Sequence, residues 1–250
     1  MSVQADSILA GLNVVAAVRA HRSGVPGLDA KVVALKEFQQ RRFAHTYADL
    51  LRSPRHGPAA RFFLDELYGP NDFTRRDAEF AKVIPGLVKL FPEGLVATVA
   101  DVAKLHALSE TLDTAMATHL RDAGLGAIDY ARAWQSVGRA CDRQEQIALM
   151  VSVAGRLDRF TRKPLLRRGL HLMRGPARAA GLAELHRFLE AGFDTFRAMG
   201  GAREFIAIVQ SREEALAASL FTANLADEGN AWRAIATLLQ PAAPIEDGVA

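Results

Sequence analysis

The positions of hydrophobic and polar residues follow an α-helical spacing through most of this chain. Between Asp29 and Leu51, for example, Leu35, Phe38 and His45 recur at intervals of three and seven residues, which places them on one side of a helix. No convincing run alternates apolar and polar residues as a half-buried strand does. The pattern therefore predicts an all-α protein.

Turn residues divide this pattern into segments and set the expected domain organisation. Helices are expected over residues 5–21, 29–51, 59–68, 74–90, 93–121, 128–141, 142–162, 164–175, 177–199 and 202–223. We expect residues 28–225 to form one bundle-like domain of about eight helices. Residues 1–27 are expected to be a loosely attached N-terminal helix with the linker SGVPG, and residues 226–250 a partly disordered C-terminal segment.

The stretch RFFLDELYGPNDFTRRD, residues 61–77, concentrates aromatic and charged residues around a turn. Gly69 can adopt the left-handed conformation that ends a helix, and Pro70 cannot continue one. Thr74 is a good residue for starting the next helix. The stretch is therefore better explained as a junction between two helices than as a ligand-binding turn.

The string FFLDELYGPNDFTRRDAEF, followed by VIPGLVKLFP, resembles a family of uncharacterised, all-helical bacterial proteins. The resemblance extends through LSETLD and RFLEAGFDTFRAMGGA and so covers roughly residues 38–222. The resemblance implies a helical fold and a cytoplasmic location, but no activity is known for the family. The resemblance therefore gives no mechanism.

Composition narrows the location and the chemistry. No apolar run approaches the ~20 residues of a membrane span, so we do not expect an integral membrane protein. Cys141 is the only cysteine, which excludes an intrachain disulfide, and the N-terminus makes a poor signal peptide, so a cytoplasmic location is expected. Motifs for phosphate-loop, dinucleotide, GxSxG, HExxH and di-iron Glu-x-x-His chemistry are all missing. Whether the protein is an enzyme is left undecided.

Three histidine–carboxylate pairs with a spacing of four residues are candidate metal or haem sites. Residues four apart share one face of a helix and could offer two ligands to one ion. The candidates are His45 with Asp49, His106 with Glu110 and the nearby Asp113, and His186 with Glu190. The same spacing also arises in structural ion pairs on helices, which is the more common explanation.

Positive charge is concentrated between Arg156 and Arg178, where Asp158 is the single acid, although the chain as a whole has a net charge of only +3. Within this segment, PLLRRGLHLMRG (164–175) predicts a short basic amphipathic helix of a kind that suits anionic lipids, phosphorylated ligands or acidic proteins. Nucleic acid is a less favoured partner, because no aromatic residues for base stacking are interleaved. The candidate anion-binding residues are Arg162, Lys163, Arg167, Arg168, His171 and Arg174. The alternative is a solvated helix whose arginines pair with acids of the same protein.

We therefore predict a non-catalytic cytoplasmic binding or adaptor protein that recognises an anionic partner through the basic helix. A metal- or haem-dependent enzyme using the histidine–carboxylate pairs is the main alternative. A carrier of a small hydrophobic ligand is a third possibility, because bundle interiors can hold ligands. The aromatic set of Phe188, Phe193, Phe196, Phe205 and Phe221 is expected to form core instead.

Overall fold

The computed structural model describes residues 3–66, 74–90, 93–121 and 125–225. The described residues form twelve helices and no strand, so the all-α prediction is confirmed, although the helix count exceeds the expected eight. The helices are α1 (Val3–Ser23), α2 (Leu28–Thr46), α3 (Ala48–Arg52), α4 (Gly57–Glu66), α5 (Thr74–Leu90), α6 (Glu93–Thr118), α7 (Ala127–Val137), α8 (Ala140–Thr161), α9 (Pro164–Leu172), α10 (Arg174–Ala179), α11 (Ala183–Ala198) and α12 (Arg203–Thr222). None of them is both long and apolar enough to cross a membrane.

Two predicted helices are each divided into two shorter ones in the structure. The helix expected over 29–51 breaks at Tyr47, whose φ of −114° and ψ of 25° lie outside the helical range. The Tyr47 ring is fully buried and its hydroxyl donates to Glu213 at 2.8 Å, so tertiary contacts fix this break. The basic segment divides at Met173 into α9 and α10.

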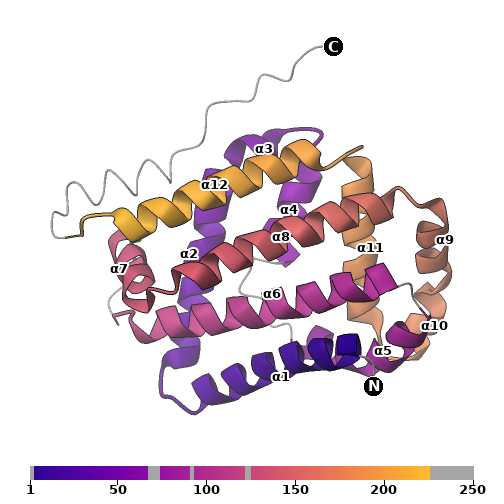
Figure 1. Cartoon of the computed structure of the whole chain (residues 1–250), viewed down its shortest axis with the longest axis horizontal. Helices are drawn as coiled ribbons and strands as arrows, with labels where there is room; N and C mark the ends of the chain where they lie inside the picture. The colour runs from indigo at the N-terminus through magenta and orange to yellow at the C-terminus, as the bar shows by residue number, and fades with distance from the viewer. Residues whose placement is uncertain (1–2, 67–73, 91–92, 122–124, 226–250) are drawn as a thin grey trace.

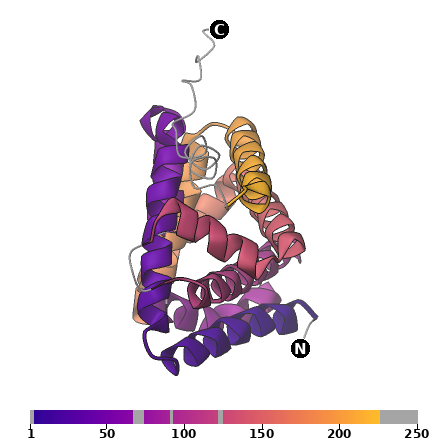
Figure 2. The same cartoon turned by 90° about the vertical axis from the view of Figure 1, so that its left-hand side faces the viewer.

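The long helices form two crossing layers. Figure 1 shows α12, α8, α6 and α1 running side by side across the view, with α2 and α11 crossing behind them. Figure 2 shows the same layer from its end, with α2 upright beside it. The largest core cluster lies between the layers and contains Phe43, Tyr47, Phe63, Phe196 and Phe205.

Helix α1 packs against the rest of the fold more closely than the expected loose attachment. Ile8 and Val15 are buried, and α1 runs along α6. Gly11 permits this approach, because a Cβ atom there would lie only 3.0 Å from the backbone carbonyl of Ala103. The predicted junction at Gly69 and Pro70 lies outside the described residues.

Candidate functional site

The basic segment forms one end of the molecule, where α9 and α10 contact each other and α11 (Figure 1). Pro164 occupies the first turn of α9, where its fixed φ favours helix and its missing N–H has no partner to lose. Leu166 and Leu170 are half-buried against the protein, and His186 Nε2 lies 2.8 Å from the Leu170 carbonyl. One face of α9 is therefore fixed to the fold, which leaves the opposite face outward.

Half of the cations between Arg156 and Arg178 are neutralised by acids of the same chain. The ion pairs are Arg156–Asp101, Arg162–Asp158, Arg167–Asp194 and Arg174–Glu190, with nitrogen–oxygen distances of 3.1, 2.7, 3.0 and 2.6 Å. Asp194 and Glu190 belong to α11, so two of these pairs attach the basic segment to that helix.

The other four cations of the segment are exposed and form no ion pair within the described part of the chain. We call Arg159, Lys163, Arg168 and Arg178 the tip cations. They lie at the end of α8, directly before α9, on α9 and on α10, and these helices follow one another in contact. No acid occurs in the sequence from residue 159 to residue 183, so no chain neighbour reduces this charge.

The structure divides the predicted anion-binding residues into two groups. Arg162, Arg167 and Arg174 are engaged in ion pairs, whereas Lys163 and Arg168 are tip cations. His171 is exposed, with its Nδ1 3.7 Å from Glu190. Sequence reasoning did not select Arg159 and Arg178, although the lack of acids around them was a usable signal.

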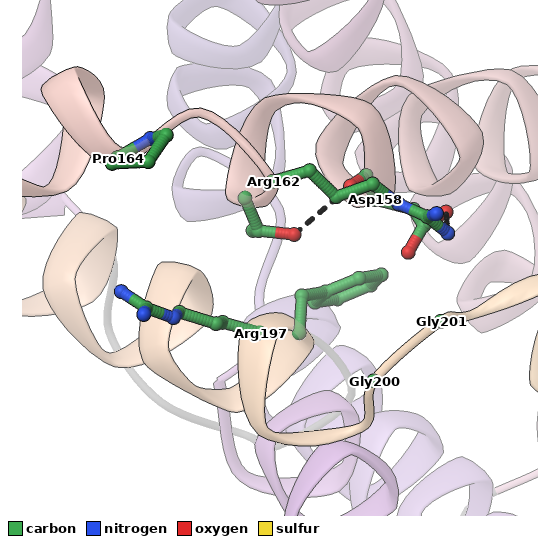
Figure 3. A pocket seen from close by; sticks show the side chains of 8 residues that line it. Asp158, Arg162, Pro164, Arg197, Gly200 and Gly201 are labelled. Atoms are coloured by element: carbon green, nitrogen blue, oxygen red, sulfur yellow. Dashed lines mark hydrogen bonds and ion pairs between the residues drawn. The ribbon is translucent and has the colours of Figure 1, made fainter.

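A hollow of about 190 Å³ adjoins the start of α9, between the ends of α8 and α11 (Figure 3). Arg162 and Arg197 line it together with Asp158, which accepts hydrogen bonds from Arg162 and from the backbone N–H of Ala202. Arg197 is exposed and forms no ion pair among the described residues. The hollow therefore adds one further cation next to the tip cations.

The predicted metal ligand Glu110 lies instead in a buried ion-pair network. Its side chain is only 2 % exposed, and its two oxygens each lie 2.6 Å from a cation, Lys36 Nζ and Arg22 Nη1. Arg19 approaches the same carboxylate at 3.5 Å. Burial acts to raise the pKa of Glu110, but the charges of Lys36, Arg22 and Arg19 outweigh it and lower the pKa from 4.5 to about 2. The network connects α1 and α2 to α6.

The residues predicted to accompany Glu110 have separate partners. His106 Nε2 lies 3.0 Å from Asp77, which is also paired with Arg19 at 2.9 Å. Asp113 accepts a hydrogen bond of 2.9 Å from Gln39, and its burial raises its pKa. His106, Glu110 and Asp113 therefore take part in polar contacts between helices, which is the role expected of buried charged groups.

The other two predicted pairs also form contacts within the fold. His45 is exposed, whereas Asp49 is buried and accepts two hydrogen bonds from Arg212, at 2.8 and 2.7 Å. His186 Nδ1 lies 3.8 Å from Glu190, whose main partner is Arg174. No group of three His, Cys, Asp or Glu side chains suited to a metal ion occurs in the described ranges. These contacts support the ion-pair interpretation of the spacing.

Two of the five phenylalanines expected in the core are buried, and the other three are half-buried. Phe196 and Phe205 are buried, and their rings lie 6.0 and 5.6 Å from the ring of Phe63. A hollow beside Phe63 and Phe205 measures about 10 Å³, which is too small for an organic ligand. The carrier hypothesis thus gains no support from this part of the core.

The comparisons with known proteins give a family but no activity. The profile of a family described as "Domain of unknown function (DUF8198)" matches residues 17–227. No curated protein and no solved structure matches this chain.

Proposed function

The chain belongs to this family, whose description assigns no activity, and we propose from the geometry that it is a non-catalytic binding or adaptor protein for an anionic partner. The tip cations are its proposed contact residues. One observation supports the proposal: within a single basic segment, four cations are neutralised by the fold and four are presented to solvent without an acid. A bacterial origin and a cytoplasmic location stay predictions from the sequence.

Guanidinium and ammonium groups that form no ion pair within the described fold are available to phosphate or carboxylate groups, although Lys163 Nζ also lies 5.7 Å from the centre of the Phe160 ring. Arginine binds such groups with two parallel hydrogen bonds, and several cations on neighbouring turns raise the local concentration of an anionic ligand. The pair Arg167–Asp194 attaches α9 to α11, and the pair Arg174–Glu190 attaches α10 to α11. The backbone that carries the tip cations is therefore already ordered, and binding costs mainly the ordering of their side chains.

The first prediction concerns the charge of the tip. The triple variant Lys163→Gln, Arg168→Gln, Arg178→Gln is expected to bind anionic probes roughly a hundredfold more weakly, since each cation contributes about 1 kcal/mol near an anionic surface. Its free energy of unfolding should change by less than about 1 kcal/mol, because exposed charges contribute little to stability. Binding of heparin and of phosphatidylglycerol vesicles at two salt concentrations tests the first expectation. A thermal melt of the variant and of the wild type tests the second.

A matched control removes the same charge from elsewhere on the surface. Arg41, Arg52 and Arg121 are exposed and lie outside the basic segment, so their triple replacement by Gln is expected to weaken binding far less. Equal weakening by both triple variants would show that net charge alone drives binding. If the wild type binds neither heparin nor the vesicles at low salt, the proposed function is contradicted.

A further inference from the structure

The outward face of α9 carries two leucines that nothing in the described fold covers. Leu165 and Leu172 are 78 % and 76 % exposed. At about 100° per residue they lie within about 20° of each other around the helix, with Gly169 between them on the same face. Met173, at the end of α9, is 54 % exposed. Among the residues whose exposure the structure describes, these are the three most exposed large apolar side chains.

One exposed apolar side chain would be ordinary, but several exposed apolar side chains close together are unusual. Scattered surface leucines are common, whereas two leucines on one nine-residue helix, with Met173 directly after it, form an apolar patch that water solvates poorly. The opposite face of α9 is already used, because Leu166 and Leu170 are half-buried against the fold. Turning the helix to bury Leu165 and Leu172 would expose those residues and break the pair between Arg167 and Asp194.

The tip cations border this apolar face. Arg168 lies one turn from both leucines, and Lys163 directly precedes the helix. The stems of lysine and arginine are apolar, so they can contact acyl chains while the charged ends reach the headgroups. An apolar stripe flanked by cations is the arrangement by which amphipathic helices lie in the interface of an anionic bilayer.

The shape of the tip also favours a bilayer over an acidic protein. Leu165 and Leu172 belong to α9, which lies at one end of the molecule (Figure 1), and both side chains are more than three-quarters exposed. Binding to a protein requires a partner of complementary shape around such side chains, whereas lipids adapt to them. We propose that the anionic partner is a bilayer surface with anionic headgroups, on which α9 lies with Leu165 and Leu172 inserted. This inference rests on the proposed function.

The test separates apolar insertion from charge. Leu165→Ala with Leu172→Ala removes two inserted side chains and retains every cation, so binding to phosphatidylglycerol vesicles should fall at least about tenfold. Heparin binding should stay unchanged, because it requires the cations alone. The control Val14→Ala with Val33→Ala changes two exposed apolar residues of α1 and α2 and should leave vesicle binding intact. If the double variant unfolds, each single leucine variant should still lose at least about threefold.

Each other outcome has a definite meaning. Unchanged vesicle binding in the leucine variants overturns the proposed insertion. Binding of the wild type to heparin but not to vesicles overturns it as well. Both results leave the proposed function standing. Loss of self-association in the leucine variants, measured by sedimentation equilibrium, would assign the face to a second copy of the chain and overturn the inference. Absence of binding to vesicles and to heparin would overturn the inference and the proposed function together.

Discussion

Replacing Glu110 by Gln is expected to lower the free energy of unfolding by about 3–5 kcal/mol. The melting temperature should fall by about 10 °C. The carboxylate is 2 % exposed and is the shared partner of Lys36, Arg22 and Arg19. Without it, Lys36 loses its ion pair and three cations remain close together at the contact of α1, α2 and α6, although Arg19 and Arg22 keep Asp77 and Asp29 as partners. The lowering of the pKa of Glu110 from 4.5 to about 2 corresponds to about 3 kcal/mol, which agrees with this range.

The pH dependence of the same variant provides an independent check. A lowered pKa means that the contribution of Glu110 is fully present above pH 4.5 and is lost as the pH falls toward about 2. The stability difference between wild type and variant should therefore shrink over this range. Glu145→Gln is the matched control. It removes an exposed ion pair between α8 and Lys104 of α6, the helix that carries Glu110, and should cost less than about 1 kcal/mol. Equal costs for the two variants would contradict the buried network.

Asp49→Asn is expected to cost about 3 kcal/mol, because it leaves the charge of Arg212 without its two-fold hydrogen-bonded partner. Burial acts to raise the pKa of Asp49, but the hydrogen bond and charge of Arg212 lower it below its usual value. If the cost comes from the uncompensated cation, adding Arg212→Met should recover at least half of it. Denaturant unfolding of the two single variants and the double variant measures this coupling.

Two results would contradict this account of Asp49. If the cost of the double variant equals the sum of the costs of the two single variants, the two residues act independently. Stabilisation of the wild-type protein by added zinc, manganese or iron(II), lost in Asp49→Asn, would restore the metal-site hypothesis for His45 and Asp49.

The helical fold could be predicted because it depends on local patterns. The spacing of apolar residues identified α6 and α12 nearly to their ends, at 93–118 and 203–222. The break at Tyr47 could not be predicted this way, since it depends on the contact with Glu213, which is distant in the sequence. The close packing of α1 likewise depends on Gly11 meeting the backbone of Ala103.

The candidate site could be located from the sequence but not resolved into roles. The basic segment was evident as a run of cations without acids. Which cations are neutralised depends on Glu190 and Asp194, which reach the segment only through the fold of α11. The outward face of α9 was also missed, because Leu165 and Leu172 become conspicuous only when Leu166 and Leu170 are seen against the protein.

The claim that α9 meets the anionic partner is tested most directly by an environment-sensitive dye at position 172. In a Cys141→Ser background, the dye is attached to Leu172→Cys or, as the control, to Val33→Cys on α2, and phosphatidylglycerol vesicles or heparin are added. We expect a blue shift at position 172 with vesicles, a smaller change there with heparin, and no change at position 33. Binding of either probe without any change at position 172, or with equal changes at both positions, would contradict the account.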